Sequence, residues 1–312
     1  MEKTDTRPPF AASGGVIPPE FRKIKTPCYV LDETALIKNA ELMGKIAEKT
    51  GCKMLLAQKA FSNYDCYHLL EPYLAGTEAS GLYEARLGAQ EMPGKEVHVF
   101  CAGYREDEFE ELLCFADHIV FNSPSQLLRF GKRAKQAGKS VGLRINPECS
   151  TQEGHAIYDP CAPGSRMGTT RAQWEAAVKM HPDLTGLLDG IHFHTLCEQD
   201  SSDLETTLAA VKVKFGDLIS QVKWLNLGGG HHITRPGYDI ARLEKCIEAA
   251  KEEWKVDIYL EPGEAWALNA GFFLTTVLDV LQNGDTRLAI LDGSAACHMP
   301  DVLEMPYRPP LL

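Results

Sequence analysis

The sequence lacks any apolar run long enough to span a bilayer, and none of its ten cysteines forms a C-x-x-C pair. Its first ten residues are polar and contain no apolar stretch of the kind that directs secretion. A disulfide framework is not expected at this chain length and cysteine spacing. These absences predict a cytoplasmic protein with reduced thiols and no membrane partner.

The sequence has less positive than negative charge, with 32 Lys and Arg against 43 Asp and Glu and a net charge of -11. Nucleic acids and anionic membranes repel such a chain, so neither is expected as its main partner. An acidic protein suits a small cationic substrate. The apolar content of 44% and the charged content of 24% are those of an ordinary globular protein.

What the sequence does contain is a regular alternation of strand-like and helix-like segments, with Gly, Pro, Asn and Asp in the turns. Eight such units over roughly 230 residues predict a parallel (β/α)₈ barrel of the TIM type, with an open doubly wound sheet as the alternative. The predicted strands are Lys53–Ala57, Thr77–Ser80, Val97–Ala102, His118–Phe121, Val141–Ile145, Leu188–His194, Val222–Leu227 and Asp257–Leu260. The predicted helices are Glu33–Lys49, Asn63–Leu74, Leu82–Gln90, Glu106–Phe115, Ser125–Ala137, Arg171–Met180, Leu204–Ile219 and Asp239–Glu253.

The two ends of the chain do not follow this alternation. Residues 1–25 are rich in Pro and Gly, and Thr26–Leu31 predicts a strand. After the eighth strand, Gly271–Leu281 and Arg287–Leu291 predict a hairpin that turns at Asn283-Gly284. We therefore expect residues 1–32 to form a lead-in and the first strand of a β domain, residues 33–268 the barrel, and residues 269–312 the start of a small, incomplete C-terminal β domain.

Polar residues follow the ends of several predicted strands. In a parallel barrel the carboxyl ends of all strands meet at one mouth, so these side chains should converge. The residues are Lys59, Glu78, Arg144, His192, His194, Gly228, Gly229, Gly230, His231, His232, Glu261 and Glu264.

Four of these features have a shared chemical sense. A lysine such as Lys59 can form a Schiff base, and Gly228–Gly230 can present backbone N–H groups to a phosphate. Glu261 can pair with a protonated ring nitrogen, and His194 can stack on a ring. Each feature also has an ordinary explanation: an exposed strand-end lysine, a tight turn, an acidic loop residue and a core histidine. Together they are what pyridoxal 5'-phosphate requires.

The motifs resemble those of a known family. The strings Ala57-Gln58-Lys59-Ala60, His192-Phe193-His194, Asn226-Leu227-Gly228-Gly229-Gly230-His231 and Leu260-Glu261-Pro262-Gly263-Glu264 resemble the alanine-racemase-like, fold type III pyridoxal phosphate decarboxylases. Within that family the chain is most similar to the carboxynorspermidine decarboxylases. The strings that favour this subgroup are Phe193–Glu198, Glu261–Ala265, Leu291–Ser294 and His298–Asp301.

The resemblance implies the following roles. Lys59 would carry pyridoxal phosphate, no metal would be needed, and the substrate would be a polyamine carboxylate processed by a homodimer with active sites at its interface. The residues implied to bind the cofactor with Lys59 are Glu78, Arg144, His194, Gly228, Gly229, Gly230 and Glu261. The candidates to bind the ammonium groups of the substrate are Glu198, Glu264 and Asp292. Family members continue into a Gly-Pro-Thr-Cys segment and a late tyrosine that this sequence does not contain, so we expect weak activity or weak dimerisation.

Three alternatives stay open. Within the family, the chain could be a diaminopimelate or ornithine-type decarboxylase or a racemase, although ornithine-specific members carry an arginine where Glu264 stands. From another class, His192, His194, His231 and His232 could be the ligands of a metal-dependent barrel hydrolase. Such barrels usually place a His-x-His motif on the first strand. A non-catalytic pyridoxal phosphate carrier with the same barrel would lack the predicted β domain.

Overall fold

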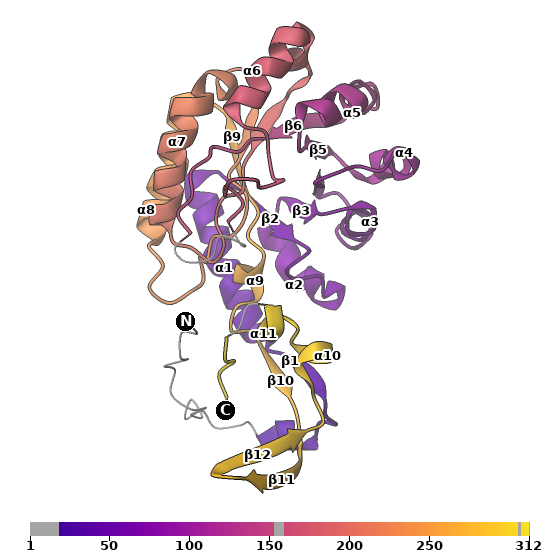
Figure 1. The fold of residues 1–312 in the computed structure, drawn as a ribbon, viewed down its shortest axis with the longest axis vertical. Coiled ribbons are helices and arrows are strands. Elements are labelled where there is room, and N and C mark those ends of the chain that lie inside the picture. The colour runs from indigo at the N-terminus through magenta and orange to yellow at the C-terminus, as the bar shows by residue number, and fades with distance from the viewer. Residues whose placement is uncertain (1–18, 153–158, 305–306, 312) are drawn as a thin grey trace. The chain divides into compact units, whose positions relative to one another are not determined.

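The computed structural model describes residues 19–152, 159–304 and 307–311 (Figure 1). The chain divides into two compact units. The larger unit is Glu33–Ala270, and the smaller unit combines Met1–Asp32 with Gly271–Leu312. Within the described ranges, no helix has the length and apolar character needed to cross a membrane.

The larger unit is a closed barrel of eight parallel strands that follow one another in chain order. The last strand pairs with the first, where Lys53 lies opposite Tyr259, so the sheet has no free edge. This confirms the predicted barrel and excludes the open sheet. The strands are β2 (Lys53–Ala57), β3 (Gly76–Ala79), β4 (Glu96–Phe100), β5 (His118–Phe121), β6 (Ser140–Arg144), β7 (Gly190–His192), β8 (Trp224–Asn226) and β9 (Asp257–Leu260).

Helices connect the strands and lie around the outside of the barrel (Figure 1). Polar caps define where several of them begin: Thr170 and Gln173 form a reciprocal capping box at one helix, and Asp200 and Asp203 form another. The helices are α1 (Glu33–Thr50), α2 (Tyr67–Leu70), α3 (Leu82–Glu91), α4 (Glu106–Phe115), α5 (Pro124–Gln136), α6 (Arg171–Met180), α7 (Ser201–Ile219), α8 (Ile240–Trp254) and α9 (Glu264–Ala267).

One predicted helix is wrong. Instead of a single helix over 63–74, the structure has the 3₁₀ turn η2 (Tyr64–Cys66), the single-turn α2 and the 3₁₀ turn η3 (Glu71–Tyr73). Pro72 stands at the start of η3 and has no amide hydrogen, so an α-helix cannot continue through it.

The barrel interior is packed around a tryptophan. Trp224 lies with Leu55, Val120 and Tyr259 in one buried cluster. A Cβ atom at Gly190, on the neighbouring strand β7, would stand 1.9 Å from the indole of Trp224. The absence of a side chain at Gly190 therefore makes room for the largest residue of this layer.

We expect Gly190→Ala to destabilise the barrel strongly, because the added methyl group meets rigid aromatic atoms. Overpacking of this kind costs about 1–3 kcal/mol or more in the free energy of unfolding. Urea denaturation measures the effect. The matched control is Gly186→Ala, since a Cβ atom at Gly186 meets nothing within 4 Å. Equal stability of the two variants would contradict the packing argument.

The smaller unit contains two antiparallel strand pairs. β1 (Cys28–Leu31) pairs with β10 (Gly271–Leu274), and β11 (Val277–Asn283) pairs with β12 (Thr286–Leu291) across a turn that includes Gly284. The hairpin is as predicted, but the predicted strand Gly271–Leu281 is two strands. The break lies at Thr275 and Thr276, where the Asp292 carboxylate accepts hydrogen bonds from the Thr275 hydroxyl (2.7 Å) and the Thr276 amide (2.8 Å). Two short helices follow, α10 (Ala295–His298) and α11 (Asp301–Glu304).

Candidate active site

A cavity of about 220 Å³ opens at the mouth of the barrel, which is the edge formed by the carboxyl ends of β2–β9. Six of the residues predicted from strand ends line this one cavity: Lys59, Glu78, Arg144, His192, His194 and Glu261. They come from positions up to 202 residues apart in the chain, and the parallel barrel brings them together. The remaining lining residues are Ala57, Ser80, Phe100, Cys101, Ala102 and Met167.

Glu261 follows β9 directly and is held on both carboxylate oxygens. Its Oε2 lies 3.0 Å from Nε2 of His192, and its Oε1 accepts a hydrogen bond of 2.6 Å from Nδ2 of Asn226. Burial by itself raises the pKa of this carboxyl group, but the His192 imidazole and the Asn226 amide outweigh it and hold the pKa below its ordinary value. Glu261 is therefore a buried, ionised carboxylate in a fixed orientation.

The pKa of Glu78 is shifted in the opposite direction to that of Glu261. Glu78 lies on β3, only 5% exposed, and its pKa is raised well above the ordinary value. The main cause is burial, and the negative charge of Glu261 adds to it, while Lys59 and Arg144 act in the other direction. One cavity thus contains two carboxyl groups whose pKa values are shifted in opposite directions, a pairing that is typical of sites where charge has to be controlled.

His194 receives a hydrogen bond from the glycine loop. The Gly229 amide donates to its Nδ1 at 3.1 Å, so a neutral ring carries its proton on Nε2. Burial, followed by the nearby charges of Lys59 and Arg144, lowers the pKa of His194 well below the ordinary value. The imidazole is therefore neutral and fixed, with its other nitrogen free to act as a donor.

The glycine loop itself is shaped by close packing. Gly228 and Gly230 have positive φ angles of 73° and 79°, and a Cβ atom on Gly230 would stand 2.0 Å from the carbonyl oxygen of Leu196. The Gly228 amide donates to the side chain of Asn226, and the Gly229 amide donates to His194. The Gly230 amide has no hydrogen-bond partner within the described ranges of the chain. Of the three predicted phosphate donors, Gly230 is thus the one whose N–H remains available.

Arg144 is the last residue of β6, and its side chain lines the cavity. Its guanidinium lies 4.5 Å from the ring centroid of Phe100, and its Nη2 donates a hydrogen bond of 3.1 Å to the carbonyl of His194. Burial lowers the pKa of Arg144 to about 10, which leaves it charged at neutral pH. Arg144 therefore stabilises the strand end that carries His194 and adds one positive charge to the cavity.

Two of the three predicted substrate acids lie near the mouth. Burial is the largest cause of the raised pKa of the Cys197 thiol. The charges of Glu198 and Glu264 raise this pKa further, whereas Lys59 lowers it. Both carboxylates and the lysine thus act on the same thiol. Oε1 of Glu264 lies 3.6 Å from Nε2 of His232, and its side chain is 49% exposed. Glu198 is exposed and has a positive φ of 54°.

Asp292, the third predicted acid, lies in the smaller unit. There it accepts a hydrogen bond of 2.6 Å from the Thr26 hydroxyl, in addition to those from Thr275 and Thr276. These bonds, with Thr26 as the largest contribution, lower the pKa of Asp292. Its contacts explain the break between β10 and β11, and a role in substrate binding stays a prediction.

The histidines suggested as ligands of a hydrolase metal do not gather into a metal site. His192 is bound to Glu261 and His194 to Gly229. In the described ranges, three or more potential ligands come together at one other place, formed by Glu96, His98 and His118.

Sequence reasoning missed two residues of the mouth, Asn226 and Phe100. Asn226 stands just before the glycine loop, and that position was its only signal.

Comparisons with known proteins give the family of the chain. No protein-family model matches the chain. It is 40% identical over 292 residues to a carboxynorspermidine/carboxyspermidine decarboxylase from Campylobacter jejuni, covering 94% of this chain and 74% of the relative. It is also 40% identical over 292 residues to a carboxyaminopropylagmatine decarboxylase from Synechocystis sp., covering 93% of this chain and 73% of that relative.

A solved structure is similar over the same region. The crystal structure of carboxynorspermidine decarboxylase from Campylobacter jejuni, complexed with norspermidine, matches with a TM-score of 0.81 and 39% identity, covering 91% of this chain and 72% of that one. The chain thus has the fold of a fold type III decarboxylase, a class whose members imply pyridoxal phosphate as cofactor. Within that class, the chain belongs to the carboxynorspermidine/carboxyspermidine decarboxylase family.

Proposed function

We propose that the chain removes CO₂ from the carboxylated end of a polyamine, carboxynorspermidine or carboxyspermidine, with pyridoxal phosphate held at the mouth of the barrel. The bond from the α-carbon to the carboxylate breaks, CO₂ leaves, and a proton takes its place. The observation that carries the proposal is the meeting of Lys59 with the fixed, ionised Glu261 in one cavity, in a member of this family.

The chemistry of the donor set fits the cofactor. Lys59 supplies a primary amine for covalent attachment, and Glu261 supplies a buried negative charge that suits a protonated ring nitrogen. The neutral imidazole of His194 offers a flat surface, and the Gly230 amide offers an N–H to the phosphate. When bound, the cofactor acts as an electron sink for the pair left behind by the departing CO₂.

The residues around Glu261 have positioning roles in this proposal. His192 and Asn226 occupy both of its oxygens, so the carboxylate cannot rotate away from the cavity. Nδ1 of His192 has no partner among the described residues, which favours a proton on Nε2 that is donated to Glu261. The pair stabilises the ionised form of Glu261, which in turn would hold a proton on the ring nitrogen.

Glu198 and Glu264 are proposed to bind the distal ammonium groups of the substrate. The charges of Glu198, Glu264 and Lys59 all act on the pKa of the Cys197 thiol, which supports a shared role for the two carboxylates. A charge-assisted hydrogen bond to each carboxylate would contribute about 1.5–3 kcal/mol. The homodimer and the cytoplasmic location that the family resemblance implies are part of the same proposal.

We expect kcat/KM to be roughly 10- to 100-fold higher for carboxynorspermidine and carboxyspermidine than for ornithine, lysine or diaminopimelate, because the shorter substrates lose at least one distal contact. Steady-state CO₂ release measures this preference. Carboxyaminopropylagmatine belongs in the same panel, since a relative of equal identity is named for it and its terminal group is a guanidinium. A higher kcat/KM for diaminopimelate would contradict the proposal.

A variant pair links that preference to the site. Glu264→Gln is expected to raise KM for the polyamine about tenfold with little change in kcat. The matched control is Glu41→Gln, which neutralises an exposed acid on α1. Equal KM values for the two variants would remove Glu264 from substrate binding.

A further inference from the structure

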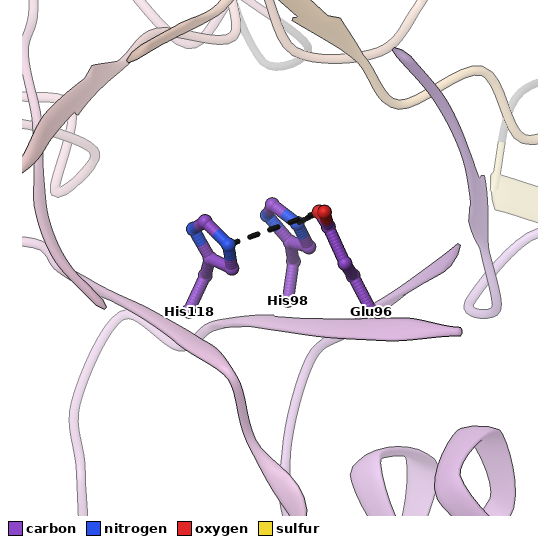
Figure 2. A group of neighbouring side chains, drawn as sticks. All are labelled: Glu96, His98 and His118. Carbon is purple, nitrogen blue, oxygen red and sulfur yellow. Dashed lines mark hydrogen bonds and ion pairs between the residues drawn. The ribbon is translucent and has the colours of Figure 1, made fainter. Parts of the chain in front are cut away.

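A second polar cluster lies at the floor of the barrel, the edge formed by the amino ends of the strands. Glu96 begins β4, His98 follows two residues later, and His118 begins β5. Residues two apart on a strand point to the same face, and His98 is the register partner of His118 on the next strand. The three side chains therefore lie side by side, as Figure 2 shows.

One carboxylate oxygen faces both imidazoles. Oε2 of Glu96 lies 3.0 Å from Nε2 of His98 and 3.8 Å from Nε2 of His118. The two rings stack with their centroids 3.9 Å apart. Lys53 binds the other carboxylate oxygen at 3.1 Å, and the Tyr259 hydroxyl donates to Oε2 at 2.9 Å. The carboxylate is thus anchored from one side and directed toward the histidines on the other.

In the described ranges, hydrogen bonds account for one ring nitrogen of His98 and for neither ring nitrogen of His118. His118 forms no side-chain hydrogen bond within the described part of the chain, since 3.8 Å to Glu96 is too long for one. His98 is 1% exposed and uses only Nε2, while the Nδ1 atoms of both rings have no described partner. An ion on the Nε2 side would not touch these Nδ1 atoms. What the hydrogen bonds leave open on that side is Nε2 of His118, beside the carboxylate of Glu96 and Nε2 of His98.

We propose that Oε2 of Glu96, Nε2 of His98 and Nε2 of His118 bind a divalent transition-metal ion of the zinc type. Zinc bonds to imidazole nitrogen and carboxylate oxygen are about 2.0–2.2 Å long, so tetrahedral ligand atoms stand about 3.3 Å apart. The observed separations of 3.0 Å and 3.8 Å lie on either side of this value. The planes of the two rings are only 8° apart, so the His118 ring has to turn out of this stack to direct its Nε2 at the same ion as His98. Imidazole with carboxylate favours zinc, cobalt or nickel over magnesium or calcium.

The surroundings supply the other requirements of such a site. The side chains of Glu96 and His118 are 32% and 14% exposed, which gives the ion a path from solvent. The Lys53 ammonium opposes the charge of the ion, and Asp257, 3.9 Å from Lys53, partly offsets it.

The ion would join β4 to β5 at the floor, away from the cavity at the mouth. Its role is therefore structural, as a clamp on two neighbouring barrel strands, and it takes no part in decarboxylation. The proposal is independent of the proposed function, because neither the ligands nor the expected readouts involve the cavity residues.

The test is titration of chelator-treated, tag-free protein with Zn²⁺ by calorimetry, with a parallel thermal melt. We expect a binding step that disappears in His118→Phe, which keeps a stacking ring but removes the nitrogen, and a zinc-dependent rise in melting temperature that disappears with it. The matched control, His68→Phe, replaces an exposed histidine on α2 and should bind as the parent does. Glu96→Gln is the second variant, with affinity expected to fall at least tenfold.

Two results would overturn the proposal. One is the absence of any Zn²⁺ binding or zinc-dependent rise in melting temperature in the parent protein. The other is unchanged binding in both His118→Phe and Glu96→Gln, which would place the ion at other histidines or at cysteines. Since each variant alone is expected to weaken Zn²⁺ binding measurably, a folding defect in one leaves the other as the test.

Discussion

Lys59→Ala should abolish turnover and leave no covalently attached cofactor. Lys59 follows β2 and lines the cavity that also contains Glu78 and Glu261. An alanine removes the only lysine among the residues that line this cavity, and a covalent catalyst without its nucleophile loses the route that divides one difficult step into two easier ones. We expect a decrease in kcat of at least about 10⁴-fold, comparable to the loss of a catalytic nucleophile elsewhere.

The measurement pairs kinetics with chemistry. Protein incubated with pyridoxal phosphate is reduced with borohydride, digested and mapped, and the parent protein should carry the cofactor on Lys59. The control is Lys38→Ala, which removes an exposed lysine on α1 and should leave both the labelled peptide and kcat unchanged. Labelling of a different lysine in the parent protein would show that the chemistry has been assigned to the wrong residue.

The order of the barrel could be predicted from the sequence because each strand is a short apolar run enclosed by turn residues. β2 (Lys53–Ala57), β5 (His118–Phe121) and β9 (Asp257–Leu260) match the prediction residue for residue. The ends of the other strands differ by a few residues. Apolar runs mark what is buried, and burial extends beyond the strand: β7 stops at His192, although Phe193 beyond it is fully buried.

The mouth could be predicted in its members but not in its contacts. Parallel strands must carry Lys59, Glu78 and Glu261 to the same edge, so position alone was sufficient to group them. The bond between His192 and Glu261 joins residues 69 positions apart and depends on side-chain direction, which no local pattern records. His192 was therefore considered as a metal ligand, whereas it is the partner of a carboxylate.

The floor cluster was missed for a related reason. The Glu-x-His spacing at Glu96 and His98 placed both side chains on one face of a strand, and that signal was present in the sequence. The third member, His118, joins them through the register of β4 against β5. A shift of one residue in that register would turn His118 to the other face, and sequence periodicity does not determine register.

Glu261→Gln should separate cofactor binding from catalysis. The substitution keeps the shape of the side chain and an oxygen that can accept the hydrogen bond from His192, but it removes the buried negative charge. We expect kcat to fall roughly 100- to 1000-fold, the range observed when one preorganised electrostatic contact is removed from an active site. KM should change little, because the proposed substrate contacts lie at Glu198 and Glu264.

The negative charge of Glu261 also acts on Glu78, so the pH–rate profile gives a second readout of the Glu261→Gln substitution. Burial is the main cause of the raised pKa of Glu78, and the negative charge of Glu261 raises it further. Without that charge, the pKa of Glu78 moves down toward its ordinary value, so any limb of the pH–rate profile that reports Glu78 should move to lower pH. Asn226→Ala, which keeps the charge but frees one oxygen of Glu261, should reduce kcat without this shift. Both of these variants should differ from Glu264→Gln, which is expected to raise KM without lowering kcat. A Glu261→Gln enzyme with unchanged kcat and an unmoved pH profile would show that the buried carboxylate supports the fold and does not take part in catalysis.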